Sequence, residues 1–227
     1  MSQHIKYLAI IPAYNEAKQI AKVINLASHY LPVLVVDDGS MDNTAQLAEA
    51  AGAKVLRQPF NQGKGAALRT GFLHALSLGC EAVVTLDADG QHDPHEIRKF
   101  LQAYQARTAD LIIGQRDFSR MPLSRRLANT TGRWLFSWAM GSPIPDNQSG
   151  YRLLSRNFIM KLLDSQEQGF EFEVEMLVTC LKGCFNLEWI KIRTIYAGET
   201  SHIHPLEHIS NFLRLVWVTH KRMRHVG

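Results

Sequence analysis

Short apolar runs alternate with segments of helical periodicity through residues 6–115, and this alternation limits the fold more than any other feature. Strands that alternate with helices favour an α/β fold with a mostly parallel central sheet flanked by helices. The runs that read as strands lie at residues 7–11, 33–36, 54–56, 82–86 and 111–114. The helices between them are expected at residues 16–29, 44–51, 65–78 and 94–106.

The remainder of the chain is less regular but contains neither a linker nor an internal repeat. Helices are expected near residues 124–139, 155–163, 171–182 and 207–222, and a strand near residues 187–195. A chain of 227 residues suits one domain with a sizeable core. We therefore predict a single domain over residues 1–227.

The basic excess is confined to the end of the chain. The formal net charge is +4, and the only charged residues after Glu207 are Arg214, Lys221, Arg222 and Arg224. A neutral body with a basic end argues against a nucleic-acid partner. The first residues lack the pattern of a signal peptide and no run matches a membrane span, so a cytoplasmic protein is expected.

The sequence lacks three familiar motifs, two for nucleotide binding and one for hydrolases. Gly63-Lys64-Gly65 resembles the end of a P-loop, but Gln58 replaces its first glycine and Gly65 its Ser/Thr. The third glycine of a dinucleotide fingerprint is Leu68, and no GxSxG motif is present. The sequence thus disfavours a P-loop NTPase, an NAD enzyme and an α/β-hydrolase.

The most informative polar segment is Asp87-Ala88-Asp89, directly after an apolar strand. Ligands of α/β sheets bind at the carboxyl ends of strands, where this segment lies. Two carboxylates with the amide oxygen of Gln91 suit hard cations such as Mg²⁺ or Mn²⁺. A solvated Asp–Gly turn is the alternative interpretation.

The polar loops together resemble the inverting family 2 glycosyltransferases of the GT-A fold. The resemblance covers residues 6–204 and is strongest to the branch that makes dolichyl- and polyprenyl-phosphate mannose. The segments that carry it are Ile11-Pro12-Ala13-Tyr14-Asn15-Glu16, Val35-Val36-Asp37-Asp38-Gly39-Ser40, Asn61-Gln62-Gly63-Lys64-Gly65-Ala66-Ala67, Leu86-Asp87-Ala88-Asp89-Gly90-Gln91, Gly114-Gln115-Arg116, Asp146-Asn147-Gln148-Ser149-Gly150-Tyr151-Arg152 and Glu199-Thr200-Ser201-His202.

The resemblance implies a Rossmann-like GT-A domain and a set of donor contacts. Residues 6–115 would bind the nucleotide-sugar, residues 116–206 the acceptor, and residues 207–227 would form a basic amphipathic helix. Asp87, Asp89 and Gln91 would hold Mg²⁺ or Mn²⁺, with Asp89 counted as catalytic. The residues expected to contact the nucleotide-sugar are Pro12, Ala13, Tyr14, Glu16, Asp38, Lys64, Asp87 and Arg116.

The acceptor side of the resemblance centres on Asp146, the general base in relatives that activate a hydroxyl. A polyprenyl phosphate is already ionised, so Asp146 would then position sugar or acceptor, and Arg125 and Arg126 would bind the phosphate. The family's Lys near the final segment is His202 here, and Arg193 would supply the missing charge over the diphosphate. Turn, helix-start or solvated-surface roles are the alternatives for these residues.

The C-terminal segment has helical periodicity, with Ile209, Phe212, Leu213, Val216, Trp217 and Met223 on one stripe and basic residues opposite. Such a helix either packs on the domain or rests on anionic headgroups. We expect a metal-dependent transferase that moves a hexose from GDP-mannose or a UDP-hexose to a polyprenyl phosphate, in peripheral contact with an anionic membrane. The alternatives are a saccharide or other hydroxyl acceptor in cell-envelope glycan synthesis, or a catalytically silent nucleotide-sugar-binding subunit.

Overall fold

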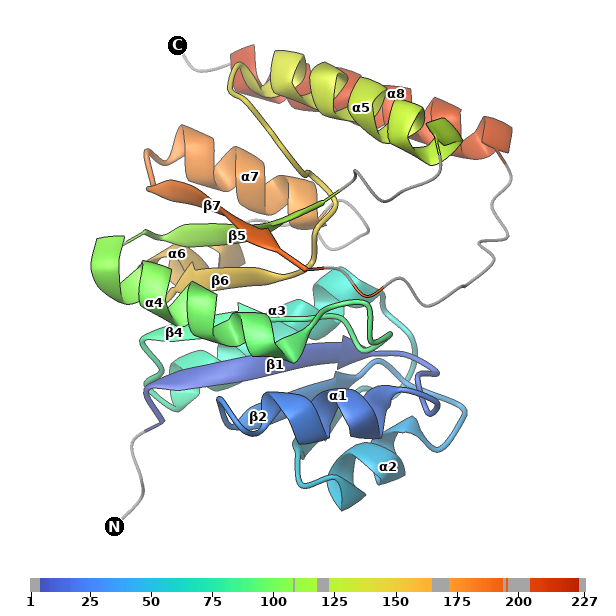
Figure 1. The fold of residues 1–227 in the computed structure, drawn as a ribbon, viewed down its shortest axis with the longest axis vertical. Helices are drawn as coiled ribbons and strands as arrows, with labels where there is room; N and C mark the ends of the chain where they lie inside the picture. Colours follow the sequence, from blue (N-terminus) through green and yellow to red (C-terminus); the bar gives the residue numbers. More distant parts are fainter. Residues whose placement is uncertain are drawn as a thin grey trace.

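A single seven-stranded sheet runs through the molecule (Figure 1). The computed structural model describes residues 5–107, 109–117, 123–164, 172–193, 195 and 205–224, with the side chains of residues 107, 123–129 and 205–211 outside the description. The strands follow the order β3-β2-β1-β4-β6-β5-β7, and β6 alone is antiparallel to its neighbours. Their bounds are β1 Tyr7–Ala13, β2 Val33–Asp37, β3 Lys54–Arg57, β4 Ala82–Thr85, β5 Leu111–Arg116, β6 Arg152–Ser155 and β7 Leu187–Ile192.

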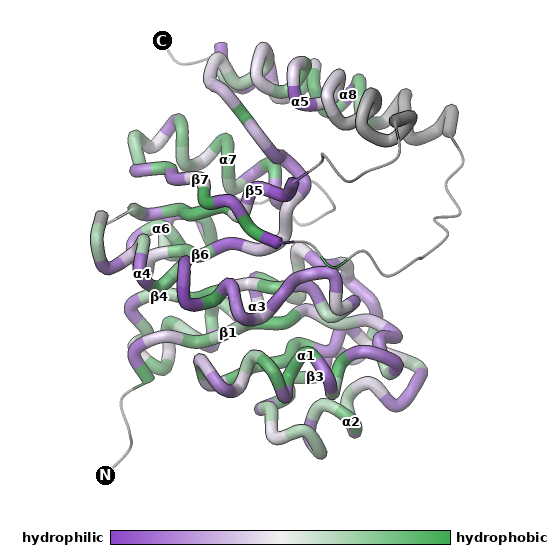
Figure 2. The backbone as a smooth tube through the Cα atoms, in the orientation of Figure 1, coloured by the Kyte–Doolittle hydropathy of each residue, from purple (hydrophilic) through white to green (hydrophobic). Residues whose placement is uncertain are grey.

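Helices cover both faces of this sheet, as the alternation predicted. Because side chains alternate along a strand, Leu8 and Ile10 of β1 enter one core, whereas Ala9 and Ile11 enter the other. Figure 2 shows β1 as hydrophobic along most of its length. The helices are α1 Ile20–Ala27, α2 Thr44–Ala50, α3 Lys64–Ser77, α4 Ile97–Arg107, α5 Leu123–Met140, α6 Arg156–Leu163, α7 Phe172–Lys182 and α8 Pro205–Arg224, with a short 3₁₀ turn at Pro94–Glu96.

The two cores draw on different helices. Apolar residues of α3, α6 and α7 form the first core together with residues of α5 and α8, and those of α1 and α4 fill the second. The expected α/β class with a mostly parallel sheet is confirmed. Parallel strands buried on both faces need the continuous apolar runs seen in β2, where all five residues are buried.

The structure departs from the sequence prediction at two elements. Strand β6, between β4 and β5, was not predicted, because its four residues begin with Arg152 and offer no polar–apolar alternation. Helix α1 begins at Ile20 rather than near Glu16. The amides of Glu16 and Ala17 instead donate to Thr44 and Asp42, which holds the preceding residues in a turn.

Helices α5 and α8 run side by side at one end of the molecule, away from β1 and β2 (Figure 1). Phe136 packs edge-on against Phe212, and Trp138 stacks on His220 with ring centroids 4.0 Å apart. Of the apolar stripe expected on the C-terminal helix, Val216 is buried, whereas Leu213 and Trp217 are exposed. Within the described residues, no helix has both the length and the apolar character needed to cross a bilayer.

Gly71 of α3 packs directly against strand β1 of the sheet. A Cβ atom there would lie 2.7 Å from Cγ2 of Ile10. Gly71→Val should therefore lower the free energy of unfolding by about 1–3 kcal/mol through overpacking, as measured by urea denaturation. Leu73→Ala on the exposed side of α3 is the control and should change it by less than about 0.5 kcal/mol. Equal stabilities of the Gly71 variant and the wild type would contradict this packing.

Candidate active site

The loops after β1 and β2 are joined by hydrogen bonds to each other. The Asn15 amide donates to Oγ of Ser40, and the Met41 amide donates to Oδ1 of Asn15, each over 2.9 Å. Asn15 has a φ of 56°, a left-handed conformation that asparagine tolerates better than most residues. The two loops therefore form one rigid wall at the carboxyl edge of the sheet.

The residues predicted to bind the nucleotide occupy different depths of this wall. Pro12 and Ala13 are buried within β1, whereas Tyr14 is 42% exposed and Glu16 is half-buried. The buried carboxylate of Asp38 accepts hydrogen bonds from the amides of Gln62 and Gly63 at 2.9 and 2.8 Å. Asp38 thus fixes the chain that leads into α3, and its nucleotide contact stays a prediction.

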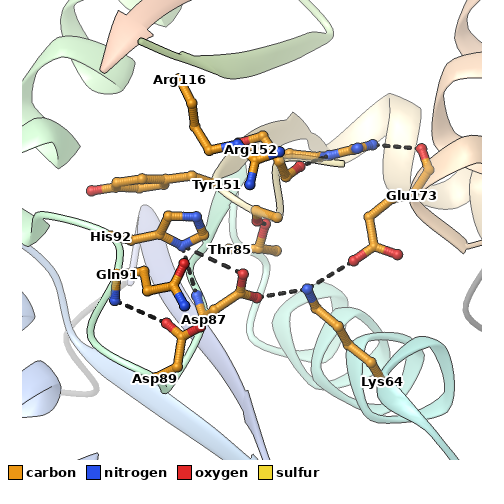
Figure 3. A network of polar contacts seen from close by, with 12 residues as sticks. Lys64, Thr85, Asp87, Asp89, Gln91, His92, Arg116, Tyr151, Arg152 and Glu173 are labelled. Atoms are coloured by element: carbon orange, nitrogen blue, oxygen red, sulfur yellow. Dashed lines mark hydrogen bonds and ion pairs between the residues drawn. The ribbon is translucent and has the colours of Figure 1, made fainter. Parts of the chain in front are cut away.

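Asp87, which follows β4, is paired with Lys64, the first residue of α3. Nζ of Lys64 lies 2.6 Å from Oδ1 of Asp87 and 2.8 Å from Oε1 of Glu173 on α7. Figure 3 shows the lysine between the two carboxylates. Burial acts to raise the pKa of Asp87, but the charge and hydrogen bond of Lys64, together with the charges of His92 and Arg116, outweigh burial and lower the pKa to about 2. The same carboxylates hold the pKa of Lys64 above its ordinary value, although burial acts to lower it.

His92 packs beside this pair as a neutral ring. Its Nδ1 accepts the amide of Asp87 at 3.0 Å, and its ring lies 4.9 Å from that of Tyr151. Burial lowers the pKa of His92, although the charges of Asp87 and Asp89 act in the opposite direction. The positive charge beside Asp87 therefore comes from Lys64, and His92 orders the backbone of the loop.

Asp89 and Gln91 form the tip of the same loop. Oδ1 of Asp89 accepts the amide of Gln91 at 2.9 Å. Across the described ranges, no three His, Cys, Asp or Glu side chains gather as a metal cage. Two carboxylates and one amide oxygen nevertheless fit Mg²⁺ or Mn²⁺, which keep few protein ligands and share oxygens with substrate phosphates. The donor chemistry of Asp87, Asp89 and Gln91 thus suits a cation that a diphosphate completes.

Gly150 lies against the Lys64–Asp87 pair, so a larger residue at this position would displace the pair. A Cβ atom there would lie 2.7 Å from both Nζ of Lys64 and Oδ1 of Asp87. The carbonyl of Gly150 accepts a 2.7 Å hydrogen bond from Oγ1 of Thr85 in β4, which fixes the backbone of Gly150 relative to the sheet. Sequence reasoning included Gly150 in a motif but gave it no role.

Asp146, four residues before Gly150, forms a bidentate ion pair with Arg116. Nε and Nη2 of Arg116 lie 2.8 and 2.9 Å from the two oxygens of Asp146, which is 1% exposed. The amides of Arg116 and Gln148 also donate to Asp146. Both carboxylate oxygens are therefore engaged, which orients Arg116.

Arg152 is a functional residue that the sequence reading missed. Its side chain is fully buried and donates to the carbonyls of Ser149 and Glu173 at 2.8 and 2.7 Å, and to that of Asn147 at 3.5 Å. One guanidinium thus fixes the loop of Asp146 and the start of α7. A charged residue in the middle of an apolar stretch was the available signal.

Two acidic residues at the start of α7 have different partners. Glu173 pairs with Lys64 in the site. Glu175 is buried and pairs with Arg222 of α8 at 2.7 Å.

The remaining predicted residues lie at the margin of the site or outside the described ranges. Arg193 is exposed and lines a depression of about 400 Å³ with Asp93, His95, Glu96 and Lys99. Two residues later, the amide of Ile195 donates to the carbonyl of Gln91 at 2.9 Å, so this segment adjoins the cation loop. The side chains of Arg125 and Arg126, and all of His202, lie outside the described residues.

Comparison with known proteins identifies the family. The model of Glycosyl transferase family 2 matches residues 8–163. The chain belongs to this family. It is 33% identical over 222 residues to a UDP-N-acetylglucosamine–dolichyl-phosphate N-acetylglucosaminyltransferase of Methanococcus voltae, covering 86% of this chain and 88% of that protein. It is 34% identical over 190 residues to an undecaprenyl-phosphate mannosyltransferase of Micrococcus luteus, covering 76% of each.

A solved structure shows the same fold. The glucosyl-3-phosphoglycerate synthase of Mycobacterium tuberculosis, in complex with Mn²⁺, UDP and phosphoglyceric acid, matches with a TM-score of 0.74 at 20% identity. The match covers 97% of this chain and 79% of that chain. The predicted GT-A fold of this family 2 member is therefore confirmed.

Because of the ion pair of Asp87, the free energy of unfolding should depend on pH. Because its pKa falls from 3.8 to about 2 on folding, Asp87 stabilises the protein above pH 4 and loses this effect as the pH falls towards 2. We expect Asp87→Asn to be less stable than the wild type by about 2 kcal/mol at pH 6. Urea denaturation at pH 6, 4 and 2.5 should show this difference shrinking with pH. A constant difference would exclude the assigned pair.

Proposed function

We propose that this family 2 member transfers a hexose from a nucleotide-sugar to a polyprenyl phosphate. The observation that carries the proposal is the convergence of the Asp87–Asp89 loop and the Arg116–Asp146 pair at one sheet edge. It is supported by the relatives, whose names specify dolichyl and undecaprenyl phosphate as acceptors. In the reaction, a phosphate oxygen bonds to the anomeric carbon while the bond from that carbon to the nucleoside diphosphate breaks, which inverts the configuration.

The donor would lie along the wall made by the loops after β1 and β2. Tyr14 and Glu16 lie in a loop held rigid by Ser40 and Thr44, which suits contacts with a base or ribose. Asp38 would act mainly by fixing residues 62–63 at the start of α3. A pre-formed wall binds a nucleotide without the cost of ordering a loop.

A divalent cation would be held by Asp87, Asp89 and Gln91. When bound, it would neutralise the charge that develops on the departing diphosphate. Asp87 remains ionised at neutral pH because Lys64 lowers its pKa. His92 accepts the amide of Asp87 and so orders the loop backbone. Gly150, which has no side chain, leaves room for Asp87 and Lys64.

A phosphate acceptor agrees with the state of Asp146. The nucleophile is already ionised, so no side chain has to remove a proton. Asp146, bound twice by Arg116 and by two amides, would position that arginine rather than act as a base. Arg125 and Arg126 remain our candidates for binding the acceptor phosphate, and Arg193 and His202 for closing over the diphosphate.

The test is product formation from GDP-mannose, UDP-glucose or UDP-N-acetylglucosamine with polyprenyl phosphate, with polyprenol as the hydroxyl acceptor. We expect a polyprenyl-phosphate sugar from one donor, a dependence on Mn²⁺ or Mg²⁺, and no product from polyprenol. Asp89→Asn should lose at least about 100-fold in rate, whereas the exposed Asp164→Asn should match the wild type. Transfer to polyprenol alone, or full activity in EDTA, would reject the proposal.

The α5–α8 surface is the part of the molecule suited to meet the lipid. Its exposed apolar side chains are those of Trp134, Trp138, Leu213 and Trp217, and Lys221 lies 3.9 Å from the Trp217 ring centre. Arg214, Lys221 and Arg224 are exposed on α8. Tryptophans beside basic residues favour the interface of an anionic bilayer. We propose peripheral contact through this surface.

Vesicle sedimentation tests the membrane contact. Replacing Arg214, Lys221 and Arg224 with Gln should weaken binding to anionic vesicles, because each basic residue contributes about 1 kcal/mol near such a surface. Arg222 is left intact because it pairs with buried Glu175. The control replaces Lys18, Lys22 and Lys54, which are exposed elsewhere, and should leave binding unchanged. Equal losses in both triple variants, or equal binding to neutral vesicles, would contradict the contact.

A further inference from the structure

The ammonium of Lys64 is paired with Asp87, a carboxylate that would bind the metal in the proposed function. Its nitrogen lies 2.6 Å from Oδ1 of Asp87, a distance at which a second cation on the same oxygen meets a full like charge. Gly150 lies directly against this ammonium, because a Cβ atom there would come within 2.7 Å of Nζ. A divalent cation at Asp87 and the ammonium at Asp87 are therefore competitors.

Glu173 gives the ammonium an alternative partner within the same side-chain conformation. Oε1 of Glu173 is 2.8 Å from Nζ of Lys64, and the Glu173 side chain is only 12% exposed. Its backbone carbonyl is fixed by the buried guanidinium of Arg152. Figure 3 shows Asp87 and Glu173 approaching the lysine from opposite sides. Glu173 is too well anchored to be an incidental surface partner.

We propose that Lys64 holds the place of the cation at Asp87, and that Glu173 is the positioning residue that retains the lysine when the cation binds. This inference rests on the cation use proposed above. The bond that Lys64 gives up to Asp87 is compensated by its remaining bond to Glu173. The exchange leaves the Lys64 ammonium beside a carboxylate both with and without metal, so the lysine does not have to leave the site.

The proposal makes opposite predictions for the two partners of Lys64. Lys64→Met removes the competing charge while keeping a long apolar stem, so Mn²⁺ alone should bind about tenfold more tightly. Glu173→Gln leaves Lys64 with Asp87 as its sole carboxylate, so Mn²⁺ should bind about tenfold more weakly. In the double variant Lys64→Met/Glu173→Gln, the Glu173 substitution should have little effect, because it acts through the lysine.

Mn²⁺ binding without nucleotide is measured at pH 8 from the electron paramagnetic resonance signal of the free ion. The exposed Glu49→Gln on α2 is the matched control for loss of one acidic charge and should bind as the wild type does. Circular dichroism and urea denaturation confirm that each variant is folded.

Three results would overturn the proposal. These are unchanged or weaker Mn²⁺ binding by folded Lys64→Met, a Glu173→Gln loss that persists in the Lys64→Met background, and absence of Mn²⁺ binding in every variant. A loss that persists in the Lys64→Met background would indicate that the charge of Glu173 acts on the metal directly and not through the lysine. Failure of the proposed function is distinguishable, since it would appear as absent sugar transfer whatever the order of Mn²⁺ affinities.

Discussion

The burial of Arg152 is the constraint on which the site depends. Strand β6 is paired with β4 on one side and β5 on the other, so its first residue lies inside the sheet with no access to water. A buried guanidinium must find acceptors, because leaving its donors unpaired costs more free energy than any local rearrangement. Here the acceptors are carbonyls of the segment before β6 and of α7. The requirement of one side chain therefore brings Asp146, Gly150 and Glu173 to the edge where the loops of β1, β2 and β4 end.

The charged side chains at this edge are held in ion pairs before a substrate arrives. Lys64 lies between Asp87 and Glu173, and Arg116 takes both oxygens of Asp146. Such pairs are costly to desolvate, so they contribute less to stability than to fixing geometry. For the site proposed here, which would meet a diphosphate and a phosphate, fixed geometry matters more. Electrostatic stabilisation of a transition state is effective when the charges do not have to reorganise during the reaction.

The sequence was sufficient for the class of fold and for the loops that carry polar groups, because both follow from local patterns. Apolar runs predicted β1, β2, β4 and β5, and each polar loop was expected where its strand ends. What the sequence did not predict depends on non-local pairing. Strand β6 is recognisable only through its neighbours, and Glu173 meets Lys64 across 109 positions of chain. Arg116 and Asp146 were each singled out, but nothing local indicated that they bind each other.

Helix α7 gives the fold a connection between its two ends. Glu173 and Glu175 lie two residues apart in the first turn of that helix, and they point to different partners. Glu173 holds Lys64 at the cation loop, whereas Glu175 is buried and binds Arg222 of α8. Lys182, the last residue of α7, also donates to the carbonyl of Arg222. Helix α7 thus connects the loop of Asp87 with α8, and Glu173 and Glu175 are two of its points of contact.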